Sequence, residues 1–343
     1  MPDVKSTALV TSLATNPDIT QTYFDKLLLS RAEYYSYHSR WATARPLKQK
    51  TGKNVVFRRY THINPAISAL VEGVPPAGQI PPLTDFTAVL SQFGDVIATT
   101  DFAEMTQTDP FLNEFYEILG EQAGYSVDMI YRDVAVSGTG NVIFANGTSR
   151  ANISSILDNN DLDRIQRSLI ATGARMMIDG AGPTSMNSNM RPVLPGFPVV
   201  IHPFIYNDLQ NISGFLSVEK YKTSGGMMPG ECGRYRNLAF FLAPDPDSLG
   251  GGAKVVSGAG AASTSVDNKA GLANVYLTLA FGREGFTIVP LDGTSTRTIT
   301  KGRTEGGPAN PLEQVGTMGW ITSLTSLRTN ENWLGRIESA ASL

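Results

Sequence analysis

The sequence has few of the residues that build most metal and catalytic sites. Its 343 residues include one cysteine, Cys232, and three histidines, His38, His62 and His202. A single cysteine excludes an intrachain disulfide. None of the histidines has another histidine or a cysteine at ligand spacing, and a zinc site needs three or four ligands. We therefore predict no metal site, no cofactor and no catalytic residues, and we expect the chain not to be an enzyme.

Long apolar runs and an excess of positive charge are also missing. There is no stretch of 18 apolar residues and no basic-then-apolar N-terminal pattern, so we predict neither a membrane span nor secretion. The net charge is −3, from 28 basic and 31 acidic residues. A dedicated nucleic-acid binder is not indicated, because basic residues supply most of the affinity for phosphates. The only local basic concentration, Arg58-Arg59 with Lys48, Lys50 and Lys53, is interpreted as a solvated arm.

Charge is scarce relative to turn-forming residues. Charged residues make up 17% of the chain, below the ~25% of typical globular domains. The 33 glycines and 20 prolines supply many turns. This composition indicates a β-rich protein whose surface is largely covered by partners, although a secreted β protein fits nearly as well. The length suggests about two domains and a substantial core.

Residues 54–100 have the pattern of a long hairpin arm. A strand-like run from Asn54 to His62 leads into a tip rich in proline and glycine, and a second β-rich run returns from Phe86 to Thr100. Proline cannot donate to a sheet ladder, so the tip is not an internal strand. The connection from Ile63 to Asp85 exceeds the ~12–15 residues of ordinary loops, and longer loops are usually functional or disordered.

The tip of this arm is unusually apolar for a loop. A solvent-exposed loop would not normally carry so many apolar side chains, and burial against another chain accounts for them. The predicted subunit interface adds basic and aromatic residues of the strands, and it comprises Arg58, Arg59, Ile67, Leu70, Val71, Val74, Ile80, Leu83 and Phe86.

A long amphipathic helix is predicted over residues 110–136. Asp109 is suited to cap its first turn, Pro110 fits the first helical position, and Gly138 supplies a stop. Its apolar residues recur every three or four positions. Gly120 and Gly124 lie inside it, where each costs about 1 kcal/mol relative to alanine, so another element is expected to approach closely there.

Other segments give shorter signals. Residues 1–53 have too little continuous apolar face to fold alone, so they are expected to dock on this subunit's core or on a neighbour's. Residues 248–265 are rich in glycine, alanine and serine and are predicted to form a flexible insertion. A second helix is expected over 161–174 and a hydrogen-bonded His202 before a short helix, with strands at 199–201, 276–289 and 333–338.

Several short motifs are informative when they are taken in order along the chain. They are residues 72–79 (EGVPPAGQ), 92–95 (QFGD), 119–124 (LGEQAG), 128–133 (DMIYRD), 137–145 (SGTGNVIFA), 202–203 (HP), 208–209 (DL), 233–236 (GRYR) and 332–334 (NWL). In these motifs, over roughly residues 50–338, the chain resembles the major capsid proteins of tailed bacteriophages with the Hong Kong 97-type fold. It resembles more closely the coat-protein family of N-four-like podoviruses.

The resemblance implies an α+β fold with four parts. These are an N-terminal arm at 1–53, an extended E-loop hairpin at 54–100, a peripheral domain at 101–150 and 300–343 built on the spine helix 110–136, and an axial domain at 151–299. It implies a major capsid protein that forms hexamers and pentamers of an icosahedral shell around double-stranded DNA, without sequence-specific binding. Scaffolding, portal and decoration proteins are the implied partners, and the implied location is the virion, assembled in the bacterial cytoplasm.

Two rival interpretations remain open from the sequence. One is another virion component, such as a decoration or tail protein, which would form small rings or trimers. The other is a β-rich carbohydrate-binding protein, which requires solvent-facing tryptophans or paired carboxylates in a pocket. Against the second, Trp320 and Trp333 are expected to be buried near the C-terminal strands.

Overall fold

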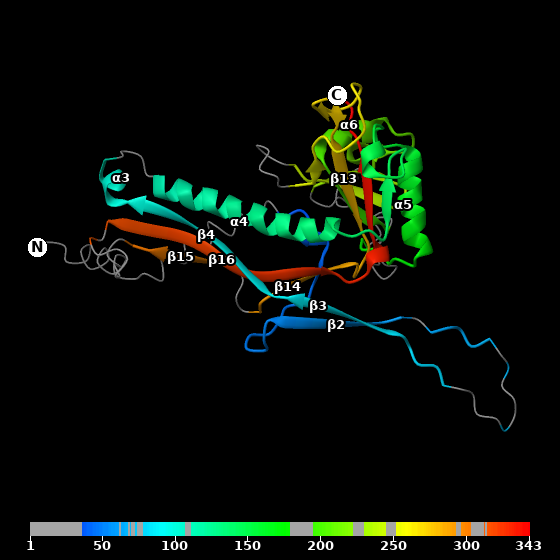
Figure 1. Cartoon of the computed structure of the whole chain (residues 1–343), viewed down its shortest axis with the longest axis horizontal. Helices are drawn as coiled ribbons and strands as arrows, with labels where there is room; N and C mark the ends of the chain where they lie inside the picture. Colours follow the sequence, from blue (N-terminus) through cyan, green and yellow to red (C-terminus); the bar gives the residue numbers. More distant parts are fainter. Residues whose placement is uncertain are drawn as a thin grey trace, which may run out of the picture.

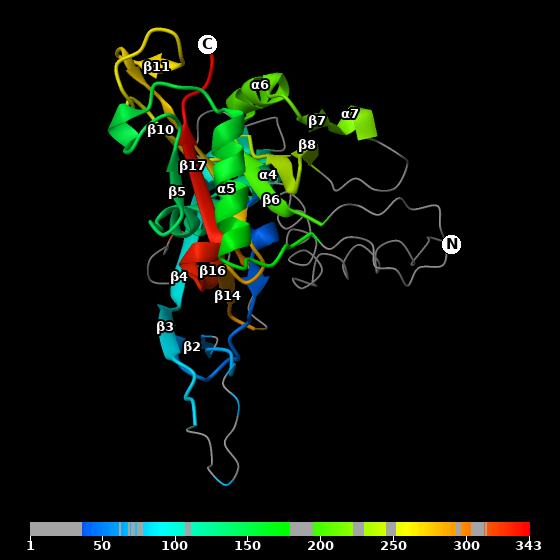
Figure 2. The same ribbon diagram turned by 90° about the vertical axis from the view of Figure 1, so that its right-hand side faces the viewer.

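The computed structural model describes residues 36–61, 63–67, 69, 73, 78–106, 111–178, 195–221, 230–244, 252–292, 296–302, 312 and 314–343. A long helix lies along one extended sheet, a second sheet with its own helices stands at one end, and a narrow arm projects from the same end (Figure 1). Figure 2 shows that the arm extends away from the second sheet. No helix in the described ranges is long and apolar enough to cross a membrane.

The long helix is α4, Phe111–Val136, which confirms the helix predicted over 110–136 within the described residues. It packs on a five-stranded sheet that contains β1 (Thr43–Ala44), β14 (Phe286–Pro290), β16 (Val315–Arg328), β15 (Arg297–Lys301) and β4 (Ser91–Thr100). Leu119 and Ala123 of α4 meet Met318 and Trp320 of β16. The two glycines inside the helix are buried, as a close approach by another element requires. At 1.5 Å per residue, the helix extends roughly 40 Å along the sheet.

The second sheet has eight strands: β5 (Val142–Phe144), β17 (Leu334–Ser339), β13 (Val275–Phe281), β6 (Phe197–Ile201), β9 (Leu238–Leu242), β8 (Glu231–Tyr235), β7 (Leu216–Ser217) and β10 (Val255–Val256). Helix α5 (Asn159–Ala171) packs against it, and Leu162, Ile165 and Leu169 are fully buried. Asp158 caps α5, so this helix begins two residues before the predicted start. Helices α6 (Pro203–Asn211) and α7 (Val218–Tyr221) complete this part of the molecule.

The arm is built differently from its prediction. Its stem is a two-stranded ladder of β2 (Asn54–Tyr60) and β3 (Leu83–Val89). The prediction of a single return strand over 86–100 is wrong. The strand that pairs with β2 ends before Leu90, and after it β4 pairs with β16 of the body over ten residues. The arm's ladder therefore ends near residue 90, and residues 91–100 belong to the body.

The sheets also divide the chain differently from the predicted domain ranges. Strand β14, in the range assigned to the axial domain, lies in the sheet under α4. Strand β17, in the range assigned to the peripheral domain, lies between β5 and β13 in the eight-stranded sheet.

The described part of the glycine-rich segment is packed, which corrects the flexible insertion predicted over 248–265. Ala253 donates its backbone N–H to Ala243, and Gly260 and Ala261 bond to Ala273 and Ile153 at 2.9 and 2.8 Å. A Cβ on Gly260 would overlap the carbonyl oxygen of Ile153. Small residues are used here because backbones lie close together, not because the segment moves. Two short strands follow, β11 (Asn268–Lys269) and β12 (Leu272–Ala273).

Candidate assembly interface

The arm exposes its apolar side chains to solvent. Every described residue from Thr61 to Asp85 is exposed, and Ile67 and Ile80 are 90% and 89% exposed. Burying one such side chain fully stabilises a structure by about 1.5–3 kcal/mol. The described part of the tip therefore gains nothing from its own body and is available to a partner. The predicted interface residues Leu70, Val71 and Val74 lie outside the described residues.

The inner face of the stem binds the arm to its own body. Phe57 and Ala88 are buried with Val289 and Leu327. Arg59 donates from Nη1 to the carbonyl oxygen of Thr329 at 3.0 Å, and its guanidinium lies 5.2 Å from the ring centre of Phe86. Arg59 and Phe86 were predicted as interface residues, and the structure gives both an intrachain role.

The outer face of the stem is exposed and largely apolar. Arg58 and Asp85 face each other across the ladder with a 3.0 Å ion pair, and both are substantially exposed. An exposed pair of this kind contributes little to stability. Exposed apolar side chains surround it, namely those of Val56, Tyr60, Leu83 and Val89. Arg58 and Leu83 of the predicted set thus lie on the outer stem face, next to the tip.

A second exposed surface lies on the five-stranded sheet, on the face opposite α4. Side chains alternate along β4, so Phe93 and Ile97 pack toward α4 while Val96, between them, is 60% exposed. The same alternation leaves Ile299 of β15 exposed on this face, on the other side of β16 from Val96. We call this surface the bare sheet face, and it comprises Gln92, Gly94, Val96, Ala98 and Thr100 of β4, Val315, Thr317, Gly319, Ile321 and Ser323 of β16, and Arg297, Ile299 and Lys301 of β15. The members from β4 and β15 are exposed, whereas along β16 only Val315 is exposed and Gly319 is buried between its neighbours.

The bare sheet face was not predicted from the sequence. The period-two alternation from Gln92 to Thr100 is a usable signal, but both of its faces look mixed in composition. Which face is free depends on where α4 lies, and that is a tertiary property.

The C-terminal end of α4 joins the two sheets. Arg328 of β16 donates from Nη1 to the carbonyl oxygen of Ala135, and Arg336 of β17 donates from Nη1 to that of Val136. The last turn of α4 has no basic residue of its own, so these two arginines supply the positive charge that a helix C-terminus favours. Arg336 also pairs with the fully buried Glu338 at 2.8 Å.

Substituting Gly138 tests this joint. A Cβ at this position would overlap the guanidinium of Arg328, which is held by Ala135 and by Glu331. We expect Gly138→Ala to lower the free energy of unfolding by about 1.5–3 kcal/mol, the size of a lost charged hydrogen bond. Chemical denaturation measures the change, with Gly78→Ala as the control because nothing lies within 4 Å of a Cβ there. An unchanged midpoint for Gly138→Ala would show that Arg328 is free to move.

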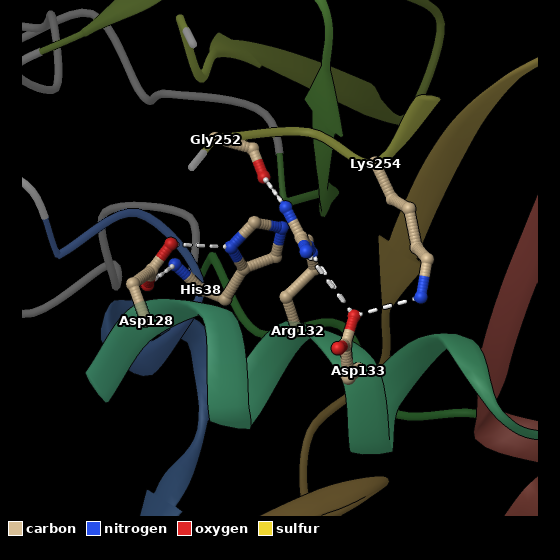
Figure 3. Close-up of polar contacts among 6 residues, drawn as sticks. All are labelled: His38, Asp128, Arg132, Asp133, Gly252 and Lys254. Carbon is tan, nitrogen blue, oxygen red and sulfur yellow. Dashed lines mark hydrogen bonds and ion pairs between the residues drawn. The ribbon is translucent and has the colours of Figure 1, made fainter. Parts of the chain in front are cut away.

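A polar cluster that is buried at Asp128 and Arg132 and exposed at Asp133 lies on the same helix (Figure 3). Asp128 accepts the backbone N–H of His38 at 2.8 Å and contacts its Nδ1 at 2.7 Å. One turn further on, Arg132 donates to the carbonyl oxygen of Gly252 at 3.3 Å, and Lys254 donates to Asp133 at 2.9 Å. Burial acts to raise the pKa of Asp133, but the bonds and charges of Lys254 and Arg132 outweigh it and hold the pKa below its usual range.

These polar groups and the remaining histidines offer no visible reaction centre. Across the described residues, no three His, Cys, Asp or Glu side chains lie together in a way that could hold a metal ion. His202 caps α6 by accepting from the N–H of Phe204, which confirms its predicted role, while His62 lies outside the described residues. Burial raises the pKa of the Cys232 thiol to about 12, so this thiol is not activated.

The tryptophans bear on the carbohydrate-binding alternative. Trp320 is buried as predicted, and Trp41 is buried as well. Trp333 is only half-buried and donates to the carbonyl oxygen of Thr172 at 3.2 Å, so its predicted full burial is wrong. Exposed aromatic platforms that stack on sugars are therefore not formed by Trp41 or Trp320.

Comparison with solved structures identifies the fold. The chain is similar to the capsid of Ralstonia phage GP4 (TM-score 0.60, 12% identity, covering 90% of this chain and 89% of that chain). It is similar to the acid-stable capsid of Helicobacter pylori bacteriophage KHP30 (TM-score 0.60, 10% identity, 89% of each chain). A cyanophage Pam1 capsid chain also matches (TM-score 0.57, 12% identity, covering 90% and 93%). No family model and no curated protein sequence matches.

The chain therefore has the mixed α/β fold of phage capsid proteins, the Hong Kong 97-type fold class expected from the sequence. Identities near 10% establish the fold and nothing finer. The narrower resemblance to N-four-like podovirus coat proteins stays a prediction.

Proposed function

We propose that this chain is a major capsid protein that assembles into the icosahedral shell around a phage double-stranded DNA genome. The observation that carries the proposal is the arm, whose described tip is exposed and apolar while its stem is fixed to the body. A single copy gains no stability from such an arm. In a lattice of identical copies, the arm of each copy is buried against a neighbour. The shared capsid fold supports the same conclusion.

We infer that the arm of one copy lies on the bare sheet face of the next. Both surfaces expose apolar side chains, such as Ile67 and Ile80 on the arm and Val96 on the face. The charges do not oppose this contact, because residues 61–84 contain one carboxylate, Glu72, and no lysine or arginine, and the face carries Arg297 and Lys301. A contact between two different surfaces repeats from copy to copy and closes into rings when the rotation permits.

Within this proposal the parts take the roles that the fold family suggests. The arm corresponds to the E-loop, α4 to the spine helix of a peripheral domain, and the eight-stranded sheet to an axial domain at the centres of hexamers and pentamers. Scaffolding, portal and decoration proteins are the proposed partners, and the virion is the proposed location, after assembly in the host cytoplasm. The net charge of −3 suits a container that must let DNA slide in without gripping it.

Sedimentation of the purified chain, with negative-stain microscopy, tests the function. We expect closed megadalton shells, formed alone or with a scaffolding protein. A decoration or tail protein, the second candidate, would give small rings or trimers instead. A chain that stays monomeric under every assembly condition, with and without scaffold, would contradict the proposal.

A further inference from the structure

Residues 37–47 cross the body as a strap. Trp41 packs on Phe241 of β9 with ring centres 4.4 Å apart, which places this end of the strap on the eight-stranded sheet. Thr43 and Ala44 then pair in parallel with β14 of the five-stranded sheet. Backbone bonds continue to Leu47, whose N–H donates to Pro290 at 2.9 Å. The strap therefore connects both sheets, although the sequence suggested only a segment that docks somewhere.

The strap is fixed to α4 by one specific contact. The carboxylate of Asp128 binds His38 twice, through the backbone N–H at 2.8 Å and through Nδ1 at 2.7 Å (Figure 3). The side chains of His38 and Asp128 are 0% and 2% exposed. The nearby ring of Phe281 lies edge-on to the imidazole. Both bonds can form at once only when residue 38 lies directly opposite residue 128.

Such a contact fixes which residues of the strap and of α4 lie opposite each other, and it adds little to the free energy of unfolding. Burying an ionised or strongly polar pair costs desolvation that its attraction barely offsets, and an apolar pair of similar volume is often as stable. Removing one partner is different, because it leaves the other buried and unsatisfied. Without the pair, the strap would be held by the packing of Tyr37 and Trp41 and, from Thr43 onward, by its backbone bonds to β14. The His38–Asp128 pair is the contact that fixes where the N-terminal end of the strap meets α4.

The same stretch of α4 fixes a third segment. Arg132 donates to the carbonyl oxygen of Gly252, and Asp133 accepts from Lys254. Lys254 immediately precedes β10, which pairs with β13 at the centre of the eight-stranded sheet. Residues 128–133 thus lie where the strap, the helix and the second sheet meet.

We propose that residues 37–47 are a locking strap, and that docking of His38 on Asp128 joins the two sheets and makes the chain competent to assemble. The first part of this proposal, the docking of His38 on Asp128, is called the lock, and it follows from contacts within one copy. The second part, that the lock makes the chain competent to assemble, rests on the proposed function. The arm leaves from the five-stranded sheet, and a shell needs the two sheets held at one orientation. The alternative is that the strap is ordinary core packing, held by Trp41 and β1 alone.

Hydrogen exchange on the full chain separates these two views. We compare wild type, Asp128→Asn, the apolar double variant His38→Leu/Asp128→Leu, and Glu114→Gln as a control at an exposed position of the same helix. Exchange of peptides within 37–47 reports the lock, and a peptide within β13 reports global unfolding. The double variant keeps the experiment decisive if Asp128→Asn alone does not fold, because it leaves no unpaired buried partner.

The lock predicts a local effect. Exchange in the strap should rise about 10- to 100-fold in Asp128→Asn, where His38 loses its charged partner. It should also rise in the double variant, because apolar packing can replace the pair in the free energy of unfolding without holding residue 38 at one position. The β13 peptide and Glu114→Gln should behave as wild type. Strap exchange equal to wild type in the double variant would overturn the lock. Shell yield is measured on the same samples. Normal shells from a chain with an open strap would overturn the link to assembly, and a wild-type chain that never forms shells would refute the proposed function while the exchange result still decides the lock.

Discussion

A chain lacking residues 64–84 is expected to fold normally and to form no shells. The described residues in this range are exposed and make no contribution to the core, so their removal costs the body little. The residue pairs of the β2–β3 ladder from Asn54–Val89 to Arg58–Asp85 remain in the deleted chain. Residues 59–63 then connect the two strands as a five-residue hairpin loop. Loop shortening of this kind changes stability by about 1 kcal/mol or less. We expect no shells because the contact made by the arm is missing from every copy.

Sedimentation velocity and thermal unfolding measure both halves of this expectation. The matched control is Ile67→Leu/Ile80→Leu, which keeps the apolar surface of the arm and should still give shells. Shells of normal size from the deleted chain would refute the role of the arm. Loss of folding in the deleted chain would show instead that the arm supports its own body.

Charging the bare sheet face should have an equally large effect. Val96→Glu/Ile299→Glu places two carboxylates on a surface that we propose receives the apolar tip of the arm. Because both positions are exposed in the single chain, we expect its unfolding temperature to change little. We expect no shells by sedimentation. Val96→Thr/Ile299→Thr is the control, because threonine keeps β-branching and adds no charge, and it should assemble.

Mixing the two defective chains tests the direction of the contact. The arm-deleted chain keeps a working face, and the face-charged chain keeps a working arm, so together they form one contact and stop. We expect a 1:1 complex at concentrations where the wild type assembles, and none from either chain alone. A mixture that contains only monomers would contradict the pairing of arm with face, and normal shells from it would show that neither surface is needed in every copy.

The sequence predicted the elements whose cause is local. The period of α4 follows from its apolar spacing, and its end at Val136 from the glycine at position 138. The predicted first residue of the helix, Pro110, lies outside the described residues. The exposed arm follows from prolines that cannot join a sheet. The strand break at Leu90 could not be predicted, because Ser91–Thr100 and Leu83–Val89 have similar β-rich compositions and differ only in the partner they meet.

The missed parts of the candidate site depend on distant contacts. His38 has no local pattern that marks it, and its role arises only when α4 brings Asp128 against it. The glycine-rich segment was predicted to be flexible because composition alone cannot distinguish mobility from close backbone packing. Arg59 and Phe86 were grouped with the tip because their sequence neighbours are exposed, whereas strand alternation turns both toward the body.

The most direct measurement places a photo-reactive benzophenone side chain at Ile67 and irradiates the protein under assembly conditions. A mixture of isotopically light and heavy copies distinguishes bonds between chains from bonds within one. We expect light–heavy cross-links from residue 67 to peptides containing 91–100, 297–301 or 315–323. Cross-links that join residue 67 only to its own chain would contradict this expectation.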